Sequence, residues 1–248
     1  MIILRNASEI TAIRHAGQIV GETLQKLKKA AQPGVSTENL DRLAIAEILA
    51  HGGEAAFKGY RGYPAAICAS INEVVVHGIP SQRILADGDI LSIDVGVRYN
   101  GYCGDAAITV PIGTIDAQSQ KLLEVTEASL HKGLEAIAPG KRLSEVSCAI
   151  QEHVEANGFS VVRSFVGHGI GTMLHEEPEI PNYGQHGTGP RLEQGMVLAI
   201  EPMVNGGHYA VRILDDGWTA VTKDGSRSAH FEHTVIVTDS GFEITTKA

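Results

Sequence analysis

Apolar residues recur along the first part of the chain at helical spacing and then in nearly continuous runs. From Ile10 to Leu27 they return every three or four positions, and the capping box Asn6–Glu9 comes just before them. This pattern predicts an amphipathic helix that ends at Pro33-Gly34. A second helix is predicted to begin with a cap at position 36 or 37 and to stop at Gly52-Gly53.

Shorter apolar runs bounded by turn residues follow, and they predict strands near 65–70, 73–77, 89–98 and 102–112. The turn Tyr99-Asn100-Gly101 joins the last two strands as a hairpin. Helical spacing then returns, first from a cap at Asp116 to about Ala138 and again from Ser144 to Ala156. The order is therefore two helices and a sheet, followed by two helices and further apolar runs.

The second part of the chain repeats the first. His168-Gly169-Ile170 matches His77-Gly78-Ile79, and the segment 195–204 matches the segment 88–97 in its glycine, apolar and acidic positions. The offset is about one hundred residues throughout, which indicates a duplicated unit. We therefore expect an α/β (α+β) fold of two pseudo-twofold-related halves, at about 8–112 and 116–240, with a central antiparallel sheet and helices outside.

Four carboxylates lie in or beside apolar runs, where an isolated charge is very costly: Asp94, Asp105, Glu201 and Glu232. Such a group must be neutralised, paired with a cation or bound to metal, and lysine and arginine are too sparse here to pair with all four. Alternation along strands can turn one carboxylate from each of four strands toward the centre between the halves. Together with His168, the set predicts ligands for two divalent cations. Because such a site needs both halves, residues 1–248 are expected to form a single domain.

Composition and charge narrow the function classes. Of the 248 residues 43% are hydrophobic, and the mean hydropathy of +0.01 is that of an ordinary soluble protein. The formal net charge of −9 and the lack of a basic run exclude nonspecific binding to nucleic acid or to an anionic membrane. Three scattered cysteines favour a reducing, cytoplasmic location over a disulfide framework. No apolar run reaches transmembrane length, and the opening residues are too short for a signal segment.

Seven short motifs carry the strongest signal, and they stand in this order: Asn72-Glu73-Val74-Val75-Val76-His77-Gly78-Ile79-Pro80, Ile93-Asp94-Val95, Gly104-Asp105, Gly167-His168-Gly169-Ile170-Gly171, His175-Glu176-Glu177-Pro178, Ile200-Glu201-Pro202 and Phe231-Glu232-His233-Thr234. With these motifs the chain resembles the type I methionine aminopeptidases of the short bacterial form over nearly its whole length. The resemblance implies the pita-bread α/β fold, which agrees with the repeat, and a single catalytic domain.

The resemblance also implies the reaction and its partners. The reaction would be removal of the N-terminal methionine from nascent or newly synthesised proteins, favouring a small second residue, by attack of a hydroxide that bridges two metal ions. The partners would be polypeptide N-termini beginning with Met, with transient ribosome association, and the enzyme would be a cytoplasmic monomer. The divalent ions would be Co, Mn, Fe or Zn, since mixed oxygen and nitrogen ligands do not choose among them. A monovalent cation would bind at Asn72, Val74 and Ser228.

By the same resemblance, each divalent ion has its own set of ligands. One ion would be held by Asp94, Asp105 and Glu232. The other would be held by Asp105, His168, Glu201 and Glu232, so that two of the carboxylates bridge the ions.

The resemblance assigns further residues to the substrate. Glu201 would carry a proton from water to the leaving amine, His175 would hydrogen-bond the developing oxyanion, and His77 would orient the peptide beyond the scissile bond. An apolar pocket for the methionine side chain would be walled by Tyr60, Tyr63, Cys68, Leu174 and Trp218.

Two departures from the family pattern and two alternative functions remain open. Gly96 stands where many relatives have threonine, and Leu174 stands where they often have an aromatic residue. His230 and His233 flank Glu232, and either could be a ligand in its place, although the family pattern favours Glu232. Strand alternation places His230 on the face of Glu232 and His233 on the opposite face. A proline-specific aminopeptidase of the same fold, which usually carries an additional N-terminal domain, is the first alternative. A non-catalytic binding homologue, which typically lacks a metal ligand, is the second.

Overall fold

The computed structural model describes residues 1–247, and in this range four α-helices form where the sequence predicts them. The capping box is confirmed, because the Asn6 side chain accepts hydrogen bonds from the backbone of Ser8 and Glu9, and the Glu9 carboxylate accepts one from the Asn6 backbone. Asp116 caps the third helix by accepting from Ser119 N at 2.8 Å. The helices are α1 (Ala7–Ala30), α2 (Thr37–Ala50), α3 (Ala117–Glu135) and α4 (Ser144–Ala156).

The predicted strands of the first half are also present. The hairpin is confirmed, since β4 (Ile90–Tyr99) and β5 (Tyr102–Pro111) pair antiparallel across the turn at Asn100 and Gly101. Both turn residues have positive φ, 48° and 82°, as tight turns between twisted strands require. On its other edge β4 pairs with β1 (Glu54–Ala55) and β2 (Ile67–Ile71). A short strand, β3 (Val74–Val76), follows β2 in the chain.

The second half is built mainly of a five-stranded antiparallel sheet with the order β15-β14-β9-β7-β8. Its strands are β7 (Gly167–Gly169), β8 (Glu176–Ile180), β9 (Val197–Ile200), β14 (His233–Val237) and β15 (Phe242–Ile244). The remaining strands of the described residues form two small sheets, with the orders β13-β10-β6 and β11-β12-β3. Their strands are β6 (Ser160–Val161), β10 (Met203–Asn205), β11 (Val211–Ile213), β12 (Ala220–Thr222) and β13 (Ser228–His230). Antiparallel strands with helices outside are confirmed, although the strands form four sheets rather than one continuous central sheet.

The two halves are joined where β5 runs beside the segment that leads into β14. Ala107 and Glu232 exchange two backbone hydrogen bonds, at 3.4 and 2.8 Å. Next to this pair a hydroxyl continues the ladder in place of a backbone group, because Thr234 Oγ1 accepts from Asp105 N at 3.0 Å and donates to Asp105 O at 2.7 Å. The backbone of Asp105 in the first half is thereby fixed beside that of Glu232 in the second.

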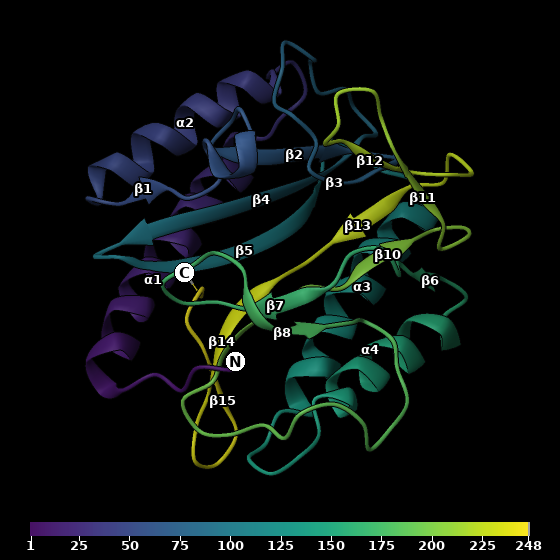
Figure 1. Cartoon of the computed structure of the whole chain (residues 1–248). Helices are drawn as coiled ribbons and strands as arrows, with labels where there is room; N and C mark the ends of the chain where they lie inside the picture. Colours follow the sequence, from purple (N-terminus) through teal and green to yellow (C-terminus); the bar gives the residue numbers. More distant parts are fainter. Residues whose placement is uncertain (248) are drawn as a thin grey trace.

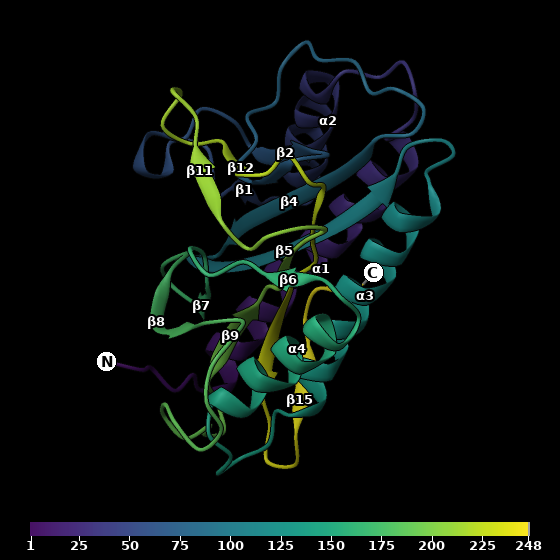
Figure 2. The ribbon, with the colours of Figure 1, turned by 90° about the vertical axis from the view of Figure 1, so that its right-hand side faces the viewer.

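The helices lie on one side of the strands, and the loops around β7, β8 and β11 lie on the other (Figures 1 and 2). α1 packs against β4 and β5 with α2 beside it, while α3 and α4 pack together against β6, β9, β10 and β13. Each helix pair closes an apolar core, one that includes Ile48 and Leu91 and another that includes Leu134 and Leu198. Since the helices cover one face, the strands can direct polar side chains to the other.

A close approach between α1 and β5 gives a first prediction. At Gly104, directly before Asp105, an added Cβ would lie 2.8 Å from Gly17 N and 3.0 Å from the carbonyl carbon of Ala16. Because these are backbone atoms of a packed helix, Gly104→Ala is expected to lower the free energy of unfolding by about 1–3 kcal/mol. Urea unfolding measures this, and Gly184→Ala is the matched control, since the nearest atom to its Cβ would lie 3.6 Å away. Equal stability of the two variants would contradict the prediction.

Candidate metal centre and active site

The four acidic residues expected as metal ligands come from both halves of the fold. Asp94 lies in β4 and Asp105 in β5, and the register of the hairpin makes them diagonal neighbours on one face. Glu201 follows the last residue of β9, and Glu232 lies between β13 and β14. The expectation that all four are strand residues is therefore wrong for the last two. One physical reason is Pro202, which follows Glu201 and has no N–H to continue a ladder.

The glycine that departs from the family pattern is covered by an aromatic ring. Gly96 pairs directly with Asp105 in the hairpin. A Cβ on Gly96 would lie 2.8 Å from Cδ1 of Phe57, whose side chain is buried. The Phe57 ring thus fills the space that a threonine side chain would need, and the hairpin offers no hydroxyl at this position.

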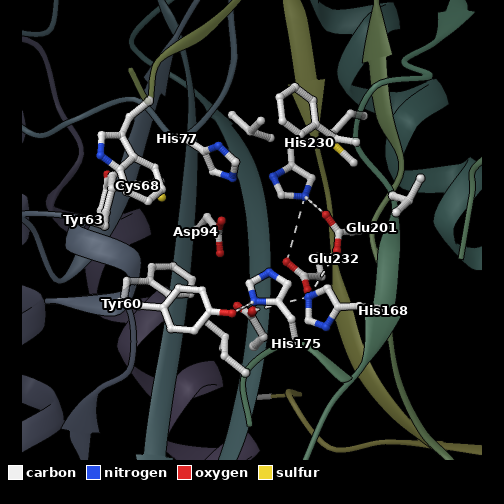
Figure 3. A pocket seen from close by; sticks show the side chains of 18 of the residues that line it. Tyr60, Tyr63, Cys68, His77, Asp94, His168, His175, Glu201, His230 and Glu232 are labelled. Carbon is white, nitrogen blue, oxygen red and sulfur yellow. Dashed lines mark hydrogen bonds and ion pairs between the residues drawn. The ribbon is translucent and has the colours of Figure 1, made fainter. Parts of the chain in front are cut away.

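His168 lies close enough to the carboxylates to share a metal ion with them (Figure 3). Its Nε2 atom is 3.4 Å from Glu201 Oε1 and 4.0 Å from Asp105 Oδ2. One donor atom each of Asp105, His168 and Glu232 lie within 4.8 Å of one another. The other ring nitrogen, Nδ1, is 2.9 Å from the backbone oxygen of Gly169. A hydrogen bond to that carbonyl places the proton on Nδ1 and leaves the lone pair of Nε2 for a metal ion.

Buried oxygen atoms without partners show that the residues fit a cation. Asp94 Oδ1, Asp105 Oδ1 and Glu232 Oε1 are buried and accept no hydrogen bond. Across residues 1–247, the ion-pair partners of Asp105, Glu201 and Glu232 are histidines, Asp94 has no ion-pair partner, and neither lysine nor arginine pairs with any of the four. Burial raises the pKa of Asp94 to about 7, and burial with mutual repulsion raises the pKa values of the other three well above their ordinary range. This set of oxygen donors with one imidazole fits divalent metal ions.

His230 belongs to the site, although it was not among the expected ligands. Its Nε2 atom is buried without a hydrogen-bond partner and lies 3.9 Å from both Glu201 Oε2 and Glu232 Oε2. Burial lowers the pKa of His230 to about 3, so its ring is neutral. The alternation of side chains along a strand is the sequence signal for His230, because it predicts His230 on the same face as Glu232. His233 points elsewhere, and its Nδ1 atom lies 2.8 Å from Thr246 Oγ1.

The carboxylates and His168 form one wall of a cavity of about 320 Å³. The residues expected to bind the divalent ions or the substrate all line it: Tyr60, Tyr63, Cys68, His77, Asp94, Asp105, His168, Leu174, His175, Glu201, Trp218 and Glu232. The lining also contains His230 and seven residues that were not expected at a site, and these seven are Phe57, Arg61, Val76, Ser164, Phe165, Val166 and Met203. Most of these are apolar, and only their closeness to a motif in the sequence could have indicated them.

Two histidines expected to contact the substrate are held by aromatic rings. His175 Nδ1 lies 2.9 Å from the Tyr60 hydroxyl, and the His175 ring stacks on the Tyr60 ring. The centroid of the His175 ring lies 4.2 Å from that of the His168 ring. His77 has a φ of 61° and packs edge-on against Phe165. Desolvation inside the cavity lowers the pKa of His175 to about 3, and burial lowers the pKa of His77 as well. Both rings are therefore neutral near pH 7, and each can donate one hydrogen bond.

The rest of the cavity is mainly apolar. The Tyr63 hydroxyl donates to the backbone oxygens of Ile67 and Gly78, at 3.1 and 3.0 Å, so it leaves no unpaired polar group there. The Trp218 ring meets the Tyr63 ring edge-on, with centroids 5.1 Å apart. Buried side chains of the same apolar cluster complete this part of the cavity, among them Phe57, Cys68 and Leu174.

A model of metallopeptidase family M24 matches residues 11–239, a range that contains every expected metal ligand. The chain belongs to metallopeptidase family M24. Two curated relatives of this M24 protein cover it almost completely. Methionine aminopeptidase 1 of Bacillus subtilis is 54% identical over 247 residues and covers 100% of both chains. The methionine aminopeptidase of Clostridium acetobutylicum is 55% identical over 247 residues and covers 99% of both.

Solved structures place this M24 chain in the same group. The crystal structure of methionine aminopeptidase from Thermotoga maritima matches it with a TM-score of 0.99 and 48% identity, over 100% of each chain. The resemblance to methionine aminopeptidases and the pita-bread fold are thereby confirmed, and the chain is a metal-dependent hydrolase, as predicted.

Prolidases share the fold of this M24 chain at a greater distance. The prolidase from Pyrococcus furiosus matches with a TM-score of 0.82, but it is 22% identical and this chain covers 66% of it. That likeness is one of fold alone, so it gives no support to the proline-specific alternative. Across residues 1–247, no helix combines the length and the apolar character needed to cross a membrane.

Proposed function

We propose that the protein removes methionine from the N-terminus of nascent or newly synthesised polypeptides. One observation carries the proposal: four carboxylates that are buried or nearly buried, three of them with unpartnered oxygen atoms, lie with an imidazole at one wall of a cavity whose other wall is mainly apolar. The first wall suits amide hydrolysis, and the second suits a thioether side chain. The full-length relatives bear the name methionine aminopeptidase, which supports the same substrate.

Two divalent ions are the proposed cofactors. Asp94, Asp105 and Glu232 would hold one, because an oxygen atom of each is buried and unpaired. The other would be held by Asp105, His168, Glu201 and Glu232. When bound, such ions polarise the scissile carbonyl and lower the pKa of water. Co, Mn, Fe and Zn all accept this mixed donor set.

Side chains of the cavity supply the proton transfer and the hydrogen bonds. Glu201, which is nearly buried beside His168 and His230, would take a proton from water and pass it to the leaving amine. The Tyr60 hydroxyl would donate to His175 Nδ1, which leaves the ring proton on Nε2. That N–H would then stabilise the oxyanion that develops on the scissile carbonyl.

The apolar part of the cavity is the proposed pocket for the methionine side chain. Aromatic rings and sulfur suit a thioether, and the walls would be Tyr60, Tyr63, Cys68, Leu174 and Trp218. His77, whose ring centroid lies 6.1 Å from that of Trp218, would orient the peptide beyond the scissile bond. Because His77 crowds that region, a small second residue would be favoured.

The setting of the enzyme forms part of the same proposal. The halves at about 8–112 and 116–240 would act as one domain, since hydrogen bonds join the backbone of Asp105 to the Thr234 hydroxyl and the backbone of Ala107 to that of Glu232. The enzyme would work as a cytoplasmic monomer on polypeptide N-termini, with transient ribosome association. A monovalent cation would bind beside Asn72, Val74 and Ser228, and the contact between Ser228 N and Asn72 O, at 2.8 Å, is compatible with this.

Hydrolysis of a short peptide tests the proposed function. The metal-loaded protein is expected to release methionine from Met-Ala-Ser and to leave Ala-Pro-Ser intact. EDTA is expected to abolish the release, and Mn²⁺ or Co²⁺ to restore it, with free methionine measured by mass spectrometry. Cleavage of Ala-Pro-Ser alone would show a proline-specific enzyme. A protein that binds metal but cleaves neither peptide would be a non-catalytic homologue.

A further inference from the structure

The loop that carries His175 has no regular secondary structure of its own. It runs over residues 170–175, between β7 and β8, and it places Leu174 and His175 at the cavity. Its position therefore depends on individual contacts rather than on a ladder of hydrogen bonds. The central contact is made by Glu176, the first residue of β8.

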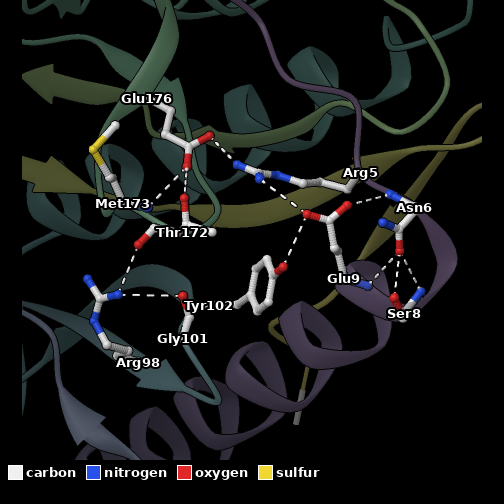
Figure 4. Close-up of polar contacts among 10 residues, drawn as sticks. All are labelled: Arg5, Asn6, Ser8, Glu9, Arg98, Gly101, Tyr102, Thr172, Met173 and Glu176. Atoms are coloured by element: carbon white, nitrogen blue, oxygen red, sulfur yellow. Dashed lines mark hydrogen bonds and ion pairs between the residues drawn. The ribbon is translucent and has the colours of Figure 1, made fainter.

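The carboxylate of Glu176 holds the loop by hydrogen bonds to Thr172 and Met173 (Figure 4). Its Oε1 atom accepts hydrogen bonds from Met173 N at 3.0 Å and from Thr172 Oγ1 at 3.2 Å. Its Oε2 atom pairs with Nη2 of Arg5. The Arg5 and Glu176 side chains are 3% and 6% exposed, so water and salt screen this ion pair little.

Arg5 is itself fixed to two distant parts of the chain. Its backbone N–H donates to Gly195 O at 2.8 Å, just before β9. Its Nη1 atom lies 3.6 Å from Glu9 Oε1 at the start of α1, and the same oxygen accepts from the Tyr102 hydroxyl at 3.1 Å. The guanidinium also lies directly against Gly171, where an added Cβ would collide with it. Arg5 thus connects the loop to α1 and to the turn before β9.

The β4–β5 hairpin holds the other side of the loop. Arg98 Nη1 donates to Thr172 O at 2.9 Å (Figure 4). Next to this bond, Cys103 N donates to Gly171 O at 2.7 Å. These bonds fix the beginning of the loop. Its end, which enters the cavity, depends on the carboxylate of Glu176.

We propose that Arg5 is a positioning residue for His175 and acts through Glu176. The inference rests on the proposed aminopeptidase function, in which His175 contacts the reacting carbonyl. Arg5 does not line the cavity, so it does not touch the substrate, and its side chain reaches His175 through Glu176 and the loop. Without its charge, Glu176 loses a partner at Oε2, the backbone from Met173 to His175 loosens, and the metal ligands stay in place. A displacement of about 1 Å at a catalytic group costs on the order of a hundredfold in rate.

Kinetics of three variants test the inference. For Met-Ala-Ser, kcat is expected to fall about tenfold to a hundredfold in Arg5→Gln, with little change in KM and in bound metal. Arg5→Lys keeps the charge and is expected to restore part of the rate. Arg14→Gln is the matched control, because it removes an exposed bidentate pair with Glu243, at 2.7 Å for both bonds, and is expected to keep the wild-type kcat.

A double-mutant cycle separates positioning from a general loss of structure. In a protein that already carries His175→Ala, Arg5→Gln is expected to cause no further fall in kcat, because no imidazole remains to be positioned. Effects that multiply would overturn the inference, and so would a wild-type kcat in folded Arg5→Gln. If Arg5→Gln does not yield folded protein, Arg5→Lys, with its smaller effect, is taken through the same cycle.

Amide hydrogen exchange gives a readout that needs no catalysis. Exchange over residues 171–176 is expected to rise in Arg5→Gln, since the acceptor of Met173 N is no longer fixed, while exchange over α4 stays as in the wild type. Unchanged exchange over the loop would overturn the inference. Failure of the proposed function is distinguishable, because it would show in the wild type as intact Met-Ala-Ser, whatever the exchange measurement gives.

Discussion

Asp105→Asn is expected to lower the release of methionine from Met-Ala-Ser on the order of a thousandfold or more. The same variant is expected to make the metal-free protein more stable. Asparagine keeps the shape of the side chain but offers one neutral oxygen in place of a carboxylate, so the proposed ions bind more weakly. In the metal-free protein, the substitution removes one of four clustered carboxylates whose pKa values are raised by desolvation and, for Asp105, by repulsion from Glu232 and Asp94.

The opposite signs of these two effects distinguish a ligand from an ordinary structural acid. In EDTA at pH 7.5, relief of repulsion is expected to raise the midpoint of thermal unfolding by about 2–4 °C for each kcal/mol gained. The further rise on adding Mn²⁺, which the wild type should show, is expected to be largely lost in the variant. Differential scanning calorimetry measures both shifts on the same samples.

Asp239→Asn is the matched control for Asp105→Asn. Asp239 is exposed, and its substitution removes the same charge from the molecule. It is expected to leave activity, metal binding and the unfolding midpoint as in the wild type. A substantial remaining activity in Asp105→Asn, or a metal-free form less stable than the wild type, would count against a bridging role for Asp105.

Much of the fold could be predicted because its signals are local. The capping box at Asn6 and Glu9 fixes where α1 begins, and the turn at Asn100 and Gly101 fixes where the hairpin reverses. Both depend on residues that are neighbours in sequence, so tertiary packing does not override them. The candidate ligands were also predictable in kind, because a carboxylate in an apolar run needs an explanation wherever the chain places it.

Other features depend on residues that are far apart in sequence, and these could not be predicted. The Phe57 ring over Gly96 has no sequence signal, since nothing local indicates which side chain covers a glycine. The partner of Arg5 is 171 positions away, and an arginine near a chain end is an ordinary surface residue by its context alone. The division into four sheets has the same cause, because it depends on how the two halves meet.

The metal-free protein is expected to lose stability as the pH rises from 6.5 to 8.0. Burial raises the folded-state pKa values of Asp105, Glu201 and Glu232 well above their unfolded values, so the folded protein binds more protons than the unfolded one. A rise in pH then favours unfolding. Asp94, with a pKa of about 7, contributes in the lower part of this range. Each group that still titrates contributes about 1 kcal/mol per pH unit.

Several histidines also titrate close to this pH range, and some raise while others lower the free energy of unfolding as the pH rises. Desolvation lowers the pKa values of His168, His175 and His230 to about 4, 3 and 3. Their contribution to stability therefore rises with pH and is complete just above the ordinary histidine pKa of about 6.5. Bonds to Glu152 and Glu145 raise the pKa of the exposed His186, so its contribution falls over the same range as that of the carboxyls. His186 lies outside the cavity, so its contribution to the free energy of unfolding is the same in all samples and cancels when they are compared.

Urea unfolding of three samples isolates the carboxylates. The free energy of unfolding is expected to fall most steeply with pH in the metal-free wild type and less steeply in metal-free Asp105→Asn, because one titrating group is gone and the others repel each other less. With Mn²⁺ the wild type is expected to gain stability over the metal-free form as the pH rises, since metal ions and protons compete for the same oxygen atoms. Stability of the metal-free wild type that rises between pH 6.5 and 8.0 would mean that these carboxyls are already ionised in the fold, and the raised pKa values would then be wrong.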